Sequence, residues 1–341
     1  MFRRTFFDSF IFAYLGILLL IAIAQPSGEQ MMRLSENFAY FLVAMVLGAA
    51  LSYGLNKSKS PALHTLGETL FEPAYKKAVK IERSWYKTFS GWQLLLFLIV
   101  TFIVGVKTTK VSITELLDED GFAGAMRLFH GLFSPNLDIL PKAVLNIIET
   151  VFMAFMATSL AIPVAFVMSF FCARNIMKGP VAYTVYMTLR TLLNFTRAIE
   201  ALIWAIIFSV WVGIGPFAGM LALMIHSVAS LAKQYSEMVE TVSEGPIEGI
   251  QSTGATKLQT VWFAVVPQVI LPYISFTVYR WDINVRMATI IGLVGGGGIG
   301  TMLIQYQGQA MWPEVGCIIL VIAVVVWGMD QASSVIREAL K

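Results

Sequence analysis

The residues best suited to bind a small ion lie in the segment Tyr279–Arg286, inside an apolar part of the chain. Arg280 and Arg286 carry guanidinium groups, whose planar donors match the oxygens of phosphate-like anions. Asp282 and Arg286 are four residues apart and share a helix face, and Arg280 and Asn284 form a second such pair. The arginines therefore indicate an anion site, or an Asp–Arg pair that holds helices or subunits together. In a third arrangement, Asp282 holds one arginine and the other faces a path.

These charges lie far along a helix that we expect Pro267 to open. At about 1.5 Å per residue, Arg280 lies about 20 Å and Arg286 about 28 Å along that helix. A charge inside a membrane costs at least ~2.5–3.5 kcal/mol on insertion scales, so it pairs or lines a wet cavity. Arg197 and Glu200 raise the same question, and there we expect a structural pair, with a place on the path as the alternative.

The composition is that of a membrane protein. Of 341 residues, 57% are hydrophobic and 13% are charged, and the mean hydropathy is +0.73, whereas soluble domains carry about 25% charged residues. The net charge of +3 is too small to indicate nucleic-acid binding. Cys172 and Cys317 lie in or beside apolar segments, which predicts buried thiols and gives neither a metal site nor a disulfide framework.

The apolar segments predict an all-α polytopic protein, because a spanning helix needs about 20 mostly apolar residues. The uncharged stretch 201–232 is too long for one span and is divided by a Gly-Ile-Gly-Pro turn signal at 213–216. Its first helix must begin before Ala201 in order to cross. The eight predicted spans are Ser9–Ser27, Asn37–Asn56, Thr88–Val106, Thr150–Ala173, the two halves of 201–232, a span starting near Pro267 and a last span at about Glu314–Ser334.

Loop charges predict the orientation. The basic segment Lys57–Lys87 is placed in the cytoplasm by the positive-inside rule, as are both termini. Parity then puts the acidic segment Lys107–Pro141 outside and the loop 237–266 inside. We prefer an uncleaved first helix to a signal peptide. The segment Ser112–Phe133 is either an amphipathic helix along the membrane surface or an unstructured loop.

The loop 237–266 contains a Glu-Gly-Pro spacing that suits force transmission between proteins. Glu248, Gly254 and Pro267 lie in the sequence EGIQSTGATKLQTVWFAVVP. Two short helices joined at Gly254 would form a rigid protruding element, because glycine accepts positive φ at a tight turn. Glu248 near the helix start is favourable for the helix dipole. The alternative is an ordinary amphipathic loop.

This loop resembles the EAA loop of ABC importer permeases, which docks onto an ATPase. Glu248, Gly254 and Pro267 match the motif, with Gly249 at an alanine position and Ala255 after the motif glycine. Further departures are small apolar exchanges at Ile250, Ala264 and Val266.

The stretch Arg197–Gly300 resembles the permeases of phosphonate and phosphite ABC importers. The matching sequences include RAIEALIWAIIF, VGIGPFAGMLAL and YRWDINVRMATIIGLVGGGGIG. The resemblance implies a type I importer permease fold with a core like that of the methionine importer and extra N-terminal helices. It divides the chain into an extension at 1–90, an additional span and external segment at 91–141, and a permease core at 142–341.

The resemblance also implies partners. They are a second copy of the chain, two cytoplasmic ATP-binding subunits and an external substrate-binding protein, all at the bacterial inner membrane. ATP and Mg would belong to the partner ATPase, since this chain has no GxxxxGK[ST] sequence and is expected to bind no cofactor and to catalyse no reaction.

The glycine run at 295–300, GGGGIG, formally contains a dinucleotide-binding pattern, but it follows a membrane helix rather than a strand. A flexible gate at Gly295, Gly296, Gly297 and Gly298, or close helix packing, fits better. His226 is expected to be a hydrogen-bonded interior histidine.

The function that the resemblance implies is ATP-driven import of phosphonate, phosphite or a related phosphorus oxyanion such as hypophosphite or phosphate. Two alternatives remain at this point. One is an ABC permease for another small solute such as methionine or an amino acid. The other is a stand-alone secondary transporter or membrane enzyme, which would work without a partner ATPase.

Overall fold

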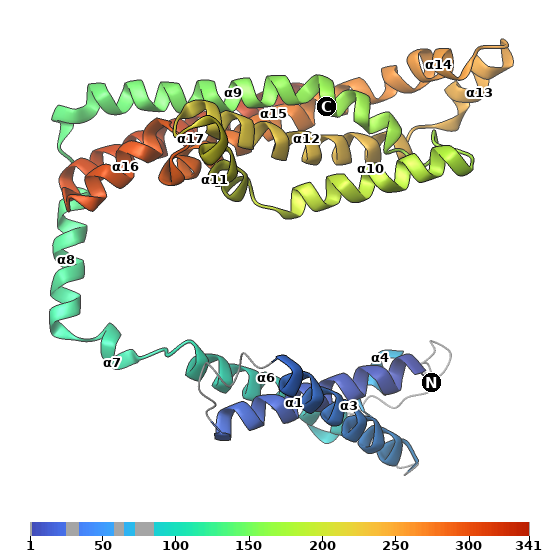
Figure 1. Ribbon diagram of the computed structural model, residues 1–341, viewed down its shortest axis with the longest axis vertical. Coiled ribbons are helices and arrows are strands. Elements are labelled where there is room, and N and C mark those ends of the chain that lie inside the picture. Colours follow the sequence, from blue (N-terminus) through green and yellow to red (C-terminus); the bar gives the residue numbers. More distant parts are fainter. Residues whose placement is uncertain (1, 25–33, 58–64, 72–84, 341) are drawn as a thin grey trace. The chain divides into compact units, whose positions relative to one another are not determined.

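The computed structural model describes residues 2–24, 34–57, 65–71 and 85–340, and these contain helices and no strand (Figure 1). Most of the basic segment 57–87, on which the predicted orientation partly rests, lies outside the described residues. The chain divides into two compact units, Met1–Gly121 and Phe122–Lys341.

The first unit contains long apolar helices that pack around a buried carboxylate. Asp8 is fully buried and accepts hydrogen bonds from Ser52 Oγ at 3.1 Å, Thr65 Oγ1 at 2.6 Å and the Gly67 amide at 2.7 Å. A buried carboxylate is tolerated only with such donors, so Asp8 fixes the packing of three helices. The helices of this unit are α1 (Phe2–Ala24), α3 (Leu34–Lys57), α4 (Leu66–Phe71), η1 (Trp85–Lys87), α6 (Phe89–Thr108) and α7 (Ile113–Leu116).

The second unit is a helical bundle built on α9 (Leu140–Phe171) and α12 (Pro216–Glu240), which run side by side (Figure 1). Their contact is lined by fully buried small residues, which let two helices approach closely. On α9 these are Ala154, Ala157, Ala161 and Ala165, and on α12 they are Ala218, Ala222 and Ala232.

The remaining helices of this unit pack on that pair or extend from it. Helix α8 begins at Glu119, before the division between the units, so the segment predicted as an amphipathic helix is helical; its place along a membrane stays a prediction. The elements are α8 (Glu119–Phe133), η2 (Leu137–Ile139), α10 (Pro180–Ala198), α11 (Ala201–Val212), α13 (Glu244–Ser252), α14 (Lys257–Thr260), the π-helical turn η3 (Val261–Val265), α15 (Val266–Ile291), η4 (Gly292–Val294), α16 (Gly298–Gly308) and α17 (Trp312–Ala339).

Among the described residues, a helix lies in each of the eight segments predicted to span the membrane. Within the described residues, 5 helices are long and apolar enough to cross, and α10 with α11 forms a sixth candidate that is bent by 89°. The all-α polytopic fold is therefore confirmed. Three boundaries differ from the prediction. Helix α9 begins at Leu140 rather than Thr150, and the seventh segment is helical from Lys257, before Pro267. Helix α11 begins at Ala201, after a sharp bend, and not before Ala201 as expected for a continuous span.

The glycine run between α15 and α16 is closely packed. Gly295, Gly297 and Gly298 have φ of 90°, 77° and 67°, and the Gly295 carbonyl accepts a hydrogen bond from the Gly215 amide at 2.9 Å. The Ile299 amide donates to Thr150 Oγ1 at 2.9 Å. Of the two expectations for this run, the structure shows close packing, and a gate at Gly295–Gly298 stays a prediction.

We expect Gly297→Ala to destabilise the protein. A Cβ there would lie 2.6 Å from Pro216, and the backbone, at φ 77° and ψ −171°, occupies a region that is essentially restricted to glycine and costs other residues about 1–3 kcal/mol. The measurement is thermal unfolding in detergent. Gly328→Ala is the matched control, because that glycine is helical with nothing near its missing Cβ, and it should leave the transition unchanged or raise it. Equal transitions for both variants would contradict the packing role.

Candidate coupling helices and intramembrane polar sites

The segment with the Glu-Gly-Pro spacing forms two short helices joined by a tight turn, as predicted. Helix α13 ends at Ser252, and Gly254 has φ of 82° in the turn. Helix α14 starts with a capping box, in which the Thr256 side chain accepts from the Gln259 amide and the Gln259 side chain accepts from the Thr256 amide. Figure 1 shows α13 and α14 projecting from one end of the bundle. The turn chemistry therefore produces a rigid, protruding helix pair.

The motif residues lie on this projection or at its base. Glu248, Gly249 and Gly254 are exposed and Ala255 is half-buried. Pro267 is in the first turn of α15, as expected, although a π-helical turn joins α15 to α14 without a break. The projection is thus continuous with the membrane helix that carries the arginines.

A side-chain hydrogen bond joins the two ends of the projecting helix pair. The Gln268 side chain accepts a hydrogen bond from the Ser243 amide at 3.0 Å and donates to the Ala264 carbonyl at 2.8 Å. Ser243 precedes α13 and Gln268 lies on α15, so this contact joins the entry and the exit of the helix pair. The helix pair is therefore tied to α15 as well as to α12.

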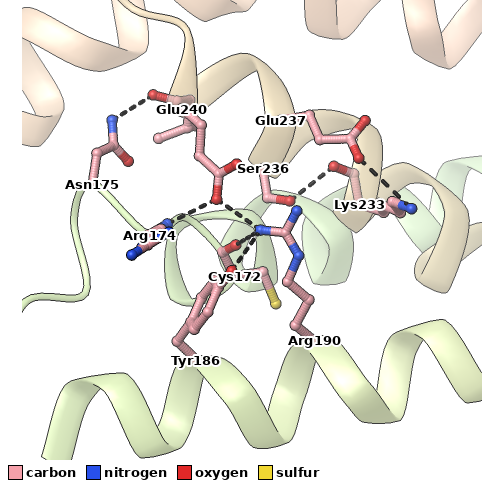
Figure 2. A network of polar contacts seen from close by, with 10 residues as sticks. Cys172, Arg174, Asn175, Tyr186, Arg190, Lys233, Ser236, Glu237 and Glu240 are labelled. Carbon is pink, nitrogen blue, oxygen red and sulfur yellow. Dashed lines mark hydrogen bonds and ion pairs between the residues drawn. The ribbon is translucent and has the colours of Figure 1, made fainter. Parts of the chain in front are cut away.

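A polar network holds the end of α12 just before this projection (Figure 2). The Arg190 guanidinium of α10 donates to Glu240 Oε1 at 2.7 Å and to the Tyr186 hydroxyl at 3.0 Å. The Arg174 amide also donates to Glu240 Oε1, at 2.9 Å. Burial raises the pKa of the nearby Cys172 thiol, and the Arg190 charge opposes this in part. The network connects the end of α9, α10 and the last turn of α12.

We expect Glu240→Gln to lower the free energy of unfolding by about 1–2 kcal/mol, because hydrogen bonds to a charged group are the stronger ones and this pair is largely shielded. The side chains of Arg190 and Glu240 are 25% and 27% exposed. Chemical unfolding in detergent measures the change. Glu237→Gln is the control, since Glu237 is 50% exposed and 3.7 Å from Lys233, and such surface pairs contribute little. A control as damaging as the variant would argue against the network.

Three polar residues of α15, Arg286, Asn284 and Arg280, have different surroundings. Arg286 Nη2 donates to Asp282 Oδ2 and lies 3.4 Å from Asp330 Oδ1 on α17. The Asp282 side chain is 3% exposed. Arg286 is therefore neutralised by two carboxylates, which confirms that Asp282 holds one of the two arginines.

Asn284 joins α15 to both central helices. Its amide donates to Thr158 Oγ1 and to Ser227 Oγ, each at 2.8 Å. Asn284 is 1% exposed, so it is enclosed by this network. In the structure Asn284 links three helices by buried hydrogen bonds. A role of Asn284 in a translocation path stays a prediction.

Arg280, unlike Arg286 and Asn284, has a buried side-chain nitrogen without a partner. It is 8% exposed, and its Nε is sealed from solvent without a hydrogen-bond partner. The charges of Arg280, Arg197 and Glu200 all act on the His226 ring of α12. His226 therefore lies near the end of α10 and within the influence of these three charges, while Arg286 belongs to another cluster.

One expectation for this region is wrong. In the described part of the chain Arg197 and Glu200 form no ion pair with each other. The expectation for His226 is met in part, since the backbone of Ile199 acts on the ring as a hydrogen-bond acceptor while Nδ1 is buried without a partner. The prediction for the cysteines is confirmed, because Cys172 and Cys317 are both free and buried.

Sequence reasoning missed Asp330, Arg190 and Glu240. Asp330 is an acid inside the last predicted span, and this was the signal that could have found it. Arg190 and Glu240 are ordinary charges in the sequence, so nothing there marks them as partners.

Apolar helices long enough to cross a membrane and an exposed helix pair at one end of the bundle are the parts that a membrane transport subunit needs. The chain belongs to the family of binding-protein-dependent transport system inner membrane components, which matches residues 145–340. It is an inner-membrane ABC transporter permease, and the family is one of transport proteins rather than enzymes.

Two relatives of known name share more than a third of their aligned residues with this chain. The chain is 38% identical over 246 residues to the phosphite transport system permease protein PtxC of Stutzerimonas stutzeri, covering 71% of this chain and 88% of PtxC. It is 35% identical over 221 residues to the phosphate-import permease protein PhnE of Mycolicibacterium smegmatis, covering 65% of this chain and 41% of that protein. The predicted resemblance to phosphonate and phosphite importer permeases is confirmed.

The fold has a counterpart among solved structures. An inward-facing structure of the MetNI methionine ABC transporter matches with a TM-score of 0.52 and 21% identity, covering 60% of this chain and 99% of that chain. At that identity the likeness shows the fold alone. The core of this chain therefore has the type I ABC importer permease fold.

Proposed function

We propose that this chain is the membrane subunit of an ATP-driven importer that carries a phosphorus oxyanion, such as phosphite, a phosphonate or phosphate, into the cytoplasm. The observation that carries the proposal is the exposed α13–Gly254–α14 helix pair on a permease fold whose relatives are a phosphite and a phosphate permease. The oxyanion class follows from those relatives and from the buried guanidinium of Arg280.

In this proposal two cytoplasmic ATPase subunits bind the projecting helices of two copies of the chain. Both termini and the projection lie in the cytoplasm, and an external binding protein delivers the anion on the opposite side. ATP and Mg are bound by the ATPase subunits. Closure of the ATPases moves α13, and the contact between Ser243 and Gln268 passes this movement to α15. The bundle then needs two discrete arrangements, one open to each side.

The test is reconstitution of the chain with its ATPase and binding protein in proteoliposomes. We expect ATP-dependent uptake of labelled phosphite that unlabelled phosphonate or phosphate reduces and methionine does not. Competition by methionine alone would assign the permease to another solute. Uptake by this chain without an ATPase, driven by an ion gradient, would overturn the importer mechanism.

A further inference from the structure

On the basis of the proposed function, we propose that the oxyanion binds at the break between α10 and α11, on Arg280, His226 and Arg197 and at the N-terminus of α11. Arg286, although it lies on the same helix as Arg280, takes no part. The sequence treated the two arginines as equivalent candidates. The structure distinguishes them by their partners.

Arg280 is a buried cation without a counterion. It is 8% exposed, and Nε is buried without a partner. No carboxylate lies within ion-pair distance of it among the described residues. It lies about 20 Å along α15 from Pro267, within the apolar helical segment. An intramembrane charge in such surroundings marks a substrate or ion site, because a bound anion would supply the missing partner.

His226 provides a second unused polar atom at the same place. Its Nδ1 is buried without a partner, while the backbone of Ile199, at the end of α10, acts on the ring as a hydrogen-bond acceptor. An imidazole nitrogen can donate a hydrogen bond to a phosphorus oxyanion in the appropriate tautomer. Two side chains on different helices, α12 and α15, thus carry unsatisfied atoms around one break.

The start of α11 adds backbone donors. Glu200 is its N-cap residue but makes no side-chain capping bond. The Ile203 amide of this 12-residue helix already donates to the Glu200 carbonyl at 3.0 Å. This leaves the amides of Ala201 and Leu202 as donors without a side-chain acceptor. The positive end of a helix attracts anions, and interrupted membrane helices bind charged substrates in this way. The bend of 89° between α10 and α11 places this helix end inside the candidate span.

The charges of the two clusters differ in sign. The Arg280 and Arg197 charges act on each other, and both act with the single acid Glu200 on the His226 ring, so two cations stand against one acid. Arg286 faces two acids, Asp282 and Asp330, which leaves a net negative charge. An anion is attracted to the first cluster and repelled by the second.

The test compares Arg280→Gln with the wild type in the purified complex of the permease and its ATPase. Sodium phosphite is the probe, and sodium acetate is the ionic control. We expect phosphite to raise the wild-type melting temperature and to leave that of Arg280→Gln unchanged. Without phosphite, Arg280→Gln should melt at the wild-type temperature or above, because it removes an uncompensated charge. ATP-dependent phosphite uptake should fall about 100-fold, the size expected when one partner of a buried charge contact is removed.

Two further variants separate binding from folding. His226→Gln should reduce the phosphite-induced rise, and Arg286→Gln should keep the full rise while melting at a lower temperature. A phosphite-induced rise that survives in Arg280→Gln would overturn the site. So would an Arg280→Gln protein that melts as early as Arg286→Gln, since that indicates a structural role. If the wild-type complex imports another solute and ignores phosphite, the proposed function fails instead.

Discussion

Gly254→Val is expected to abolish ATP-driven uptake while the protein still inserts into the membrane. Gly254 has φ of 82°, a conformation that is a true outlier for a β-branched residue. Nothing lies within 4 Å of its missing Cβ, so the expected effect comes from the backbone conformation. Changing this turn alters the orientation of α13 relative to α14. An ATPase bound there could then no longer pass its movement to the membrane helices. Uptake in proteoliposomes should fall to background, with normal amounts of protein in the membrane fraction.

Gly249→Ala is the matched control for that experiment. Gly249 is also exposed and has open space around its missing Cβ, but it lies within helix α13 and has no positive φ. Alanine is the better helix former by about 1 kcal/mol, so uptake should stay at the wild-type rate. Normal uptake by Gly254→Val would remove the coupling role from this turn. Loss in both variants would show that the surface, and not the turn geometry, is what matters.

The helix pair could be predicted from sequence because its determinants are local. A glycine with positive φ, a Thr256–Gln259 capping box and a proline in the first turn of α15 act within a few residues of their own position. The membrane helices were equally predictable, since hydropathy over about 20 residues decides them. The first residues of these helices were less predictable than the helices themselves. No sequence feature marks the π-helical turn at Val261–Val265.

The partners of the charged residues could not be predicted, because they depend on how distant helices are rotated against each other. Asp330 is 44 residues from Arg286, and Glu240 is 50 residues from Arg190. The rotation of α9 against α12 is set by a row of buried alanines, and small residues permit several close registers. The sequence therefore identified Arg280 and Arg286 as unusual, but their different surroundings emerge only from the packed bundle.

Breaking the Arg286 cluster should have the largest effect on stability. The Asp282 side chain is 3% exposed and its Oδ1 already lacks a partner, so Arg286→Gln would leave a buried carboxylate without its cation. Removing one member of a buried ion pair costs about 3–5 kcal/mol. We expect roughly 3 kcal/mol, the lower end of that range, because the Arg286 side chain is 45% exposed. Unfolding in detergent by a chemical denaturant measures this loss.

A second substitution separates the buried charge from the lost contact. Asp282→Asn combined with Arg286→Gln should recover most of the stability, since replacing both partners removes the uncompensated charge. Lys233→Gln is the control for losing a surface cation, and its pair with Glu237 is long and exposed, so it should cost less than about 1 kcal/mol. A double variant no more stable than Arg286→Gln would mean that Arg286 acts through Asp330 or through packing. Recovery would mean that Arg286 stabilises the fold by neutralising the buried Asp282 carboxylate. The arginine that attracts an oxyanion would then be Arg280, which has no carboxylate partner in the described part of the chain.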